Sequence, residues 1–326
     1  MKEKNTSKEV ILELIRNSST FLIMTHKRPD GDAISSALAM FWYLLDIGKN
    51  EKNIDIVIPE YAKELAFISG IEYVKKQPAM ENYDLAILVD CAELRMLEGK
   101  EYMELADKTI CIDHHEKEKF YANYNVVKAD VSSCTTIIFD IFRCVVPNYL
   151  NCIATGLISD TSFLTLNVNP EAKDIIKKLR ELGVDIDEIS KKLATKSNRT
   201  EELTNLVIKR GKFINGNIFC SYILQSDLLE DEKNLTNVNH KLIIQELQKE
   251  VEFETLILLI ENEAGEFKGS MRTFSDIDLN TICSELLADG KILKGGGHSY
   301  SAGCTVVGSY EDIFKTISDA IIRKKQ

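Results

Sequence analysis

The sequence lacks the features that define several common protein classes. No apolar run reaches the ~18–20 residues that span a bilayer, and the longest candidates, such as residues 33–47, are interrupted by serine. The eight cysteines are scattered and form no CxxC pair, so a zinc cluster or a disulfide scaffold is not favoured. The first residues mix both charge signs and precede no apolar core, which argues against a signal peptide. We expect a cytoplasmic protein that does not enter a membrane.

Positive charge is also scarce. Lysine and arginine total 40 against 51 acidic residues, which gives a net charge of −11. Binding of long duplex DNA depends on a basic face that neutralises phosphates, so the charge argues against such a partner. It does not argue against a small anionic substrate, because bound metal ions would offset part of the acidic charge locally.

The first half of the chain alternates between strand and helix patterns. Strands are predicted at 21–25, 54–58, 85–89 and 109–112, and helices at 7–17, 33–47, 132–145 and 149–158, with a short helix near 61–68. Pro147 is expected to end the helix 132–145. This alternation predicts an α/β domain with a mostly parallel sheet covered on both faces.

The predicted secondary structure of the second half changes twice along the chain. Residues 170–212 have a helical pattern with high charge. Strands are then predicted at 218–224, 254–261, 266–273 and 305–307, and helices at 237–250, at 279–287 and from 310 onward. Because 326 residues suit two domains, we expect a first domain at 1–190, a helical linker at 191–212 and a smaller α/β domain at 213–326.

Acids and histidines are concentrated at the ends of predicted strands and of one helix. In open α/β sheets, ligands bind at the carboxyl ends of parallel strands. Taken singly, each motif would be an ordinary turn, helix cap or solvated loop, but together they predict a site for two divalent metals. The donors favour Mn²⁺, with Mg²⁺ or Co²⁺ as alternatives. The predicted metal ligands are His26, Asp30, Asp32, Asp90, His114 and Asp160.

These residues resemble the DHH family of phosphoesterases. The family's tripeptide stands here as Asp113-His114-His115, and Gly295-Gly296-Gly297-His298 followed by Ala302-Gly303 resembles its DHHA1 domain. The resemblance covers the whole chain and is strongest to the group of bifunctional oligoribonucleases (nanoRNases) and 3′-phosphoadenosine-5′-phosphate phosphatases. It implies a parallel-sheet DHH domain joined to a smaller α/β DHHA1 domain.

The resemblance also implies roles for the matching residues. One metal would be held by His26, Asp30 and Asp90, and the other by Asp32, Asp90, His114 and Asp160, with Asp90 bridging them. Asp113 would orient a histidine, and His115 would face the scissile phosphate or the leaving oxygen. The family usually has glycine where this chain has Ser35; because all the ligands are present, we do not expect inactivation. A homodimer is a further expectation from the family.

The second domain offers a candidate phosphate clamp. Gly295, Gly296 and Gly297 by themselves indicate a flexible loop, and Arg272 by itself a surface residue. Glycine runs also let backbone N–H groups approach an anion, and arginine suits bidentate contact with phosphate. With the DHHA1 resemblance, we expect these residues and His298 to bind the substrate's terminal phosphate or nucleotide.

We therefore expect a metal-dependent phosphoesterase that hydrolyses short oligoribonucleotides to mononucleotides, 3′-phosphoadenosine-5′-phosphate to AMP, or both. The alternatives are a phosphodiesterase for linear dinucleotides from cyclic-dinucleotide turnover, a RecJ-like single-strand exonuclease, an inorganic pyrophosphatase of the same superfamily, and a non-catalytic nucleotide-binding protein. The Gly-Gly-Gly-His motif argues against the pyrophosphatase, and the complete ligand set argues against the binding protein.

Overall fold

The computed structural model describes residues 5–115, 120–165, 168–195, 198–233, 235, 238 and 240–325. The chain forms two compact units, Met1–Thr195 and Lys196–Gln326. The boundaries expected from the sequence stay a prediction. Most of the expected linker forms α7 (Asn198–Arg210), whose Leu203 and Val207 are buried in the second unit's core. No helix among the described residues is long and apolar enough to cross a membrane.

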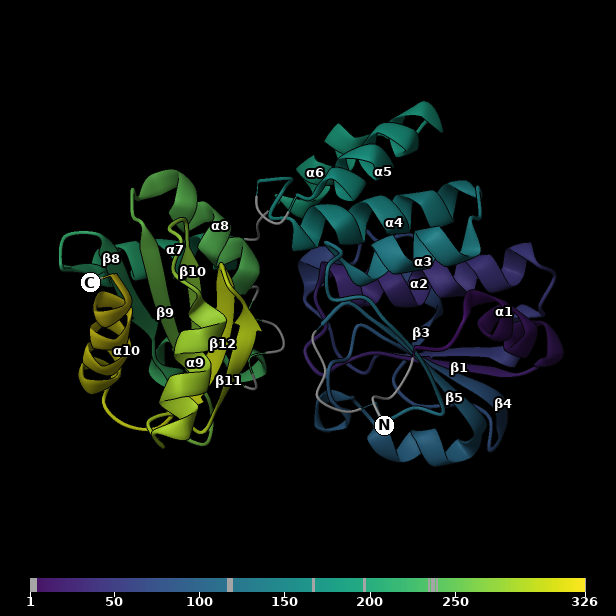
Figure 1. The fold of residues 1–326 in the computed structure, drawn as a ribbon, viewed down its shortest axis with the longest axis horizontal. Helices are drawn as coiled ribbons and strands as arrows, with labels where there is room; N and C mark the ends of the chain where they lie inside the picture. Colours follow the sequence, from purple (N-terminus) through teal and green to yellow (C-terminus); the bar gives the residue numbers. More distant parts are fainter. Residues whose placement is uncertain are drawn as a thin grey trace. The chain divides into compact units, whose positions relative to one another are not determined.

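A six-stranded parallel sheet forms the centre of the first unit, which confirms the predicted architecture (Figure 1). The strand order is β3-β2-β1-β4-β5-β6, and every neighbouring pair is parallel. The edge strands β3 and β6 were not predicted. The strands are β1 (Phe21–Met24), β2 (Ile54–Val57), β3 (Val74–Lys75), β4 (Tyr83–Val89), β5 (Ala106–Asp113) and β6 (Tyr124–Val127).

The two faces of this sheet are covered differently. On one face the core contains side chains of α1 (Lys8–Asn17), α2 (Gly31–Asp46), α3 (Cys134–Phe142), α4 (Pro147–Asp160), α5 (Pro170–Glu181) and α6 (Ile186–Leu193). On the other face Leu22, Met24 and Leu88 pack against Tyr102 and Tyr121. That second layer consists of 3₁₀ turns and irregular chain, including η4 (Leu94–Met96) and η5 (Lys100–Leu105).

Two local predictions were wrong. The helix expected near 61–68 is only a 3₁₀ turn, Lys63–Leu65. Pro147 does not end the preceding helix: α3 stops at Phe142, where Arg143 adopts a left-handed conformation with φ 48°. Pro147 instead opens α4 as its first residue. The first N–H groups of a helix have no partner within the helix, so proline costs little at this position.

The second unit is built on a mixed sheet with strand order β11-β12-β10-β9-β8-β7. β8 and β9 are parallel, and the other pairs are antiparallel. The strands are β7 (Lys212–Ile214), β8 (Ile218–Ile223), β9 (Thr255–Glu261), β10 (Phe267–Thr273), β11 (Lys294–His298) and β12 (Ser301–Val306).

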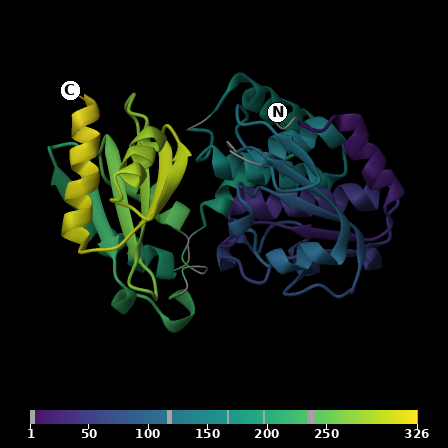
Figure 2. The ribbon, with the colours of Figure 1, turned by 60° about the horizontal axis from the view of Figure 1, so that its bottom comes forward.

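Helices cover both faces of this second sheet, but not all of it. On one face α7 and α8 (His240–Glu250) pack against side chains of β8 and β9. On the other, α9 (Leu279–Ala288) and α10 (Tyr310–Lys325) pack against side chains of β8, β9, β10 and β12. Figure 2 shows α10, in yellow, beside these strands. The start predicted for α8 includes residues 237 and 239, which lie outside the described residues.

The glycine run forms a strand and not a loop. Gly295, Gly296 and Gly297 lie in β11, which pairs with β12 as a hairpin. Gly297 has φ 148°, and a Cβ atom there would lie 2.4 Å from the backbone oxygen of Ser301. Only glycine fits the strand at this point. The reason is a contact across the hairpin, which composition does not reveal.

Candidate metal centre

The turn from β1 into α2 supplies the first three donors. His26 follows β1 and forms an isolated bridge with Leu97. Asp30 caps α2, because its Oδ1 accepts hydrogen bonds from the backbone N–H groups of Asp32 at 2.9 Å and Ala33 at 3.1 Å. Asp32 lies in the first turn of the helix and is fully buried. The turn therefore holds two carboxylates within one helical turn of each other.

Asp32 is held by the N-terminus of another helix. Its Oδ2 accepts a hydrogen bond from the backbone N–H of Cys134 at 2.7 Å, and its Oδ1 accepts from the backbone N–H of Thr135 at 3.2 Å and from Thr135 Oγ1 at 2.9 Å. The positive end of the α3 dipole stabilises a carboxylate placed there. Sequence reasoning missed both partners. The available signal was Ser133, which caps α3.

Asp90 lies between two histidines at the end of β4. Its Oδ2 is 3.6 Å from His26 Nε2, and its Oδ1 is 3.4 Å from His114 Nε2. The residue has φ 51°, a conformation that is uncommon outside glycine and that clusters at functional sites. Within the described part of the chain, the buried Oδ1 accepts no hydrogen bond of good geometry. A buried acceptor in this situation suits a cation.

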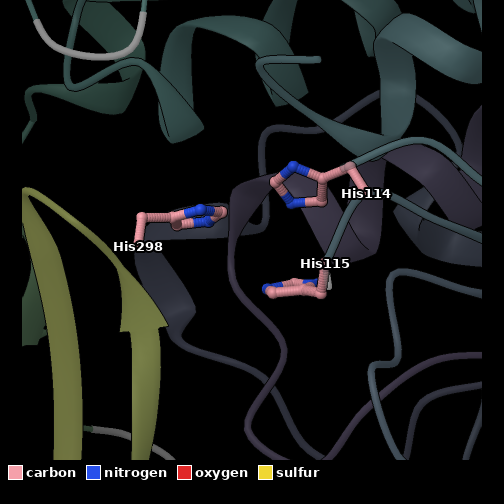
Figure 3. A group of neighbouring side chains, drawn as sticks. All are labelled: His114, His115 and His298. Atoms are coloured by element: carbon pink, nitrogen blue, oxygen red, sulfur yellow. The ribbon is translucent and has the colours of Figure 1, made fainter. Parts of the chain in front are cut away.

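The end of β5 brings in the tripeptide. His114 is buried, and its Nε2 lies 3.1 Å from Asp160 Oδ2 at the end of α4 and 4.0 Å from Asp32 Oδ2. His115 is bound to Asp113, whose Oδ1 lies 3.2 Å from the His115 backbone nitrogen and 2.8 Å from its Nδ1. The two imidazole rings lie 4.5 Å apart and are tilted by 59° (Figure 3).

The structure thus brings the six predicted metal ligands together in two groups. Within each group the donor atoms lie within 4.8 Å of one another. One oxygen of Asp90 lies near His26 of the first group, and the other lies near His114 of the second. Oxygen and imidazole donors in this combination suit divalent metals. The groups are His26 with Asp30 and Asp90, and Asp32 with His114 and Asp160.

The electrostatics of the centre favour a cation. Burial lowers the pKa of His26, but Asp90 and Asp30 outweigh it and raise that pKa to about 9. Burial likewise opposes a rise at His114, yet Asp160 and Asp90 raise its pKa well above the usual value. Burial and the charges of Asp90 and Asp160 raise the pKa of Asp32. The cluster therefore attracts protons, and a divalent ion would compete with them for the same donors.

Close packing between α2 and α4 sets the spacing of these donors. A Cβ atom at Gly156 would lie 2.5 Å from Asp32 Oδ1, and one at Gly31 would lie 2.5 Å from Ser159 Oγ. Two glycines therefore let the helices approach where their ligands meet. Ser35 fits into α2 with its side chain fully buried, and its hydroxyl makes no hydrogen bond within the described ranges.

In the second unit, strand register aligns the predicted clamp. Arg272 on β10 pairs with Ser301 on β12, and Ser301 pairs with His298 on β11. The His298 ring, labelled in Figure 3, stacks on Tyr300 with centroids 5.6 Å apart. The Gly297 N–H is bound to Asn280 Oδ1 at 3.1 Å. Arg272 and His298 thus lie on one row of the sheet, and their role in binding substrate remains a prediction.

Comparison with known families assigns both units. Residues 20–158 match the DHH family, N-terminal domain, and residues 215–323 match the DHHA1 domain. The chain therefore belongs to the DHH family, as a DHH domain followed by a DHHA1 domain.

Relatives within this class differ in size. The chain spans 30–37% of the length of the first curated relatives it matches. One of these is cyclic-di-AMP phosphodiesterase PdeA of Listeria monocytogenes, 25% identical over 54% of this chain and 30% of that protein. The bifunctional oligoribonuclease and PAP phosphatase NrnA of Thermus thermophilus is 23% identical over 92% of this chain and 90% of its own length.

The fold also has a solved counterpart. An exopolyphosphatase-related protein from Bacteroides fragilis superposes with a TM-score of 0.78 at 20% sequence identity. The match covers 98% of this chain and 96% of that structure. At this identity the likeness shows the fold alone.

Proposed function

We propose that this protein is a two-metal phosphoesterase that hydrolyses short oligoribonucleotides, 3′-phosphoadenosine-5′-phosphate, or both. The observation that supports it best is Asp90, whose two buried oxygens face the histidines of two separate donor groups. A carboxylate in that position can bridge two cations. The relative NrnA supports the substrate class, since it matches over 90% of its own length.

The residues that would hold the metals follow from the two groups. His26, Asp30 and Asp90 would hold one Mn²⁺, and Asp32, Asp90, His114 and Asp160 the other. When bound, a metal pair supplies a reactive water and neutralises charge on the phosphoryl group. Asp32 is kept in position by the N-terminus of α3. Asp30 is kept in position by the amides at the start of α2.

His115 is the candidate for proton transfer. Asp113 accepts the hydrogen bond of His115 Nδ1, which fixes the tautomer and orients the ring. The Nε2 atom is then the one positioned to exchange a proton with the leaving oxygen. Asp113 is fully buried, so its carboxylate stays a fixed partner. Arg272, His298 and the three glycines of β11 would bind the substrate's terminal phosphate or nucleotide.

A hydrolysis panel with Mn²⁺ tests this proposal. It compares a 5′-phosphorylated RNA dinucleotide, a longer RNA, 3′-phosphoadenosine-5′-phosphate and pyrophosphate, with the wild-type chain and with Asp90→Asn. Preferential cleavage of the dinucleotide or the bisphosphate, lost in the variant, supports the proposal. Absence of cleavage of every substrate by Mn²⁺-loaded wild type would contradict it.

A second candidate is a phosphodiesterase for linear dinucleotides produced from cyclic ones. It is favoured by the likeness to PdeA, whose name states activity on cyclic-di-AMP. A linear adenine dinucleotide and cyclic-di-AMP added to the same panel separate the two. Turnover of the adenine dinucleotide well above that of other RNA dinucleotides would favour this second candidate.

A further inference from the structure

One half-face of the second sheet carries polar side chains. The helices α7 and α8 pack over Leu256, Leu258 and Ile260 of β9 on this face. Their partners on β10 are Arg272, Ser270 and Lys268, which point to the same side because directly paired residues share a face. Lys268 and Arg272 are partly exposed, and Ser270 is buried.

Register extends this face across β12 and β11 as a grid of three rows. One row holds Arg272, Ser301 and His298, the predicted clamp. The middle row holds Ser270, Gly303 and Gly296. The third row holds Lys268, Thr305 and Lys294. The grid contains no carboxylate at any of its positions, although the chain as a whole is acidic.

At Gly303, in the middle row, the fold does not require glycine. Gly303 has an ordinary φ, and a Cβ atom there would meet nothing closer than the Gly269 backbone oxygen at 3.5 Å. Glycine weakens a strand by about 0.5–1 kcal/mol relative to alanine, and in strands it often marks a close approach by a ligand. The row between the two cationic rows therefore contains only a serine, Ser270, which is buried, and two glycines.

The distance between the cationic rows matches a nucleic acid strand. Lys268 and Arg272 are four residues apart on one strand, or about 13–14 Å. An extended polypeptide advances ~3.6 Å per residue, which contains three backbone bonds. Successive phosphates of a nucleic acid are separated by six backbone bonds, so the same advance per bond gives about 7 Å per nucleotide. The two rows are thus about two nucleotides apart.

We propose that Lys268 and Lys294 form a second phosphate subsite, which binds the phosphate two nucleotides away from the one at Arg272 and His298. The proposal rests on the proposed function, because it takes that clamp as the site of the terminal nucleotide. The two lysines stand on either side of Thr305, about 9–10 Å apart at the backbone. Their flexible side chains can converge on one phosphate. The subsite selects oligonucleotides of three or more nucleotides over dinucleotides.

The test is a ratio of kcat/KM values for a tetranucleotide and a dinucleotide of the same base composition. Replacing both lysines, Lys268→Gln with Lys294→Gln, should lower this ratio by about 10- to 100-fold, the loss expected for two charged contacts to phosphate. Lys291→Gln is the matched control, since this exposed lysine lies outside the grid and pairs with Asp289 at 3.6 Å. It should leave the ratio unchanged.

A binding measurement supplies an independent readout. Affinity for the tetranucleotide is measured without metal at several salt concentrations. The slope of log affinity against log salt should fall by about 0.7 in the double variant, because the subsite neutralises one phosphate and each neutralised phosphate on a single strand contributes ~0.7. An unchanged ratio and slope in a variant that still cleaves the dinucleotide would overturn the subsite alone. Failure of wild type to cleave the dinucleotide, the tetranucleotide and 3′-phosphoadenosine-5′-phosphate alike would instead contradict the proposed function.

Discussion

The two units hold their predicted site residues in place by different means. In the first, three of the six predicted ligands, Asp32, Asp90 and His114, are buried. Asp32 and Asp30 are fixed by the N-termini of helices. In the second, Arg272 and His298 are only partly buried and are aligned by the pairing of strands. Burial and fixed hydrogen bonds suit the precise placement of metals. An open sheet surface suits an anionic substrate of variable length.

The largest effect should come from Asp90. Asp90→Asn removes the negative charge shared by both donor groups, so kcat/KM should fall by ~10³-fold or more and Mn²⁺ binding measured by titration calorimetry should weaken sharply. The control is Asp107→Asn, the same change at an exposed position at the start of β5. Wild-type turnover in Asp90→Asn would show that the two groups do not act together.

The comparison predicts a different signature in the second unit. His298→Ala should raise KM by about 10- to 100-fold, the cost of one or two charged contacts to phosphate, while Mn²⁺ affinity stays at the wild-type value. His240→Ala, at the start of α8, is the matched control. A loss of metal affinity in His298→Ala would mean that the two sites are not separable in this way.

A glycine-to-alanine substitution in each unit tests how tightly the two sites are packed. Gly156→Ala should lower the free energy of unfolding by about 1–3 kcal/mol, because its Cβ atom would overlap Asp32 and Thr135. It should also weaken Mn²⁺ binding, since Asp32 must move. Gly303→Ala meets no such neighbour and should raise the free energy of unfolding by about 0.5–1 kcal/mol. Chemical denaturation of the two variants checks this, and equal losses would contradict it.

The smallest effect concerns acid stability of the first unit. Burial raises the pKa of Asp55, but hydrogen bonds from Lys75, Tyr83 and the Ala79 N–H outweigh it and hold the pKa below the usual value. The ionised carboxylate therefore stabilises the fold at every pH above its unfolded-state pKa of ~3.9. This contribution is lost as the pH falls through the lower folded-state pKa.

Asp55→Asn should accordingly make unfolding of this unit less dependent on pH between about 5 and 3. The single tryptophan, Trp42 on α2, reports the unfolding by fluorescence. Asp107→Asn is again the control. A pH dependence in Asp55→Asn as steep as that of wild type would show that another group is responsible.

Much of the first unit could be predicted because its signals are local. The strands β1, β4 and β5 each contain an apolar run, and polar residues that follow these runs were predicted to be metal ligands from the sequence. The hydrogen bonds from the N-terminus of α3 to Asp32 could not be predicted, since they join residues more than 100 positions apart. The covering of one sheet face by irregular chain was missed for the same reason.

The sequence by itself determined which metal-binding types of side chain this protein has and which family motifs it contains. Apolar runs predict the strands, and the residues that come directly after these runs can be read from the sequence. The donor set and the family motifs could therefore be predicted without coordinates. Only the tertiary structure decided that Asp90 faces both donor groups, that the glycine run is a strand, and that Lys268 and Lys294 share a row two positions beyond Ser270 and Gly296. Register and burial depend on contacts between segments that are distant in the sequence. A one-residue shift in strand pairing would move every side chain of a strand to the other face of the sheet.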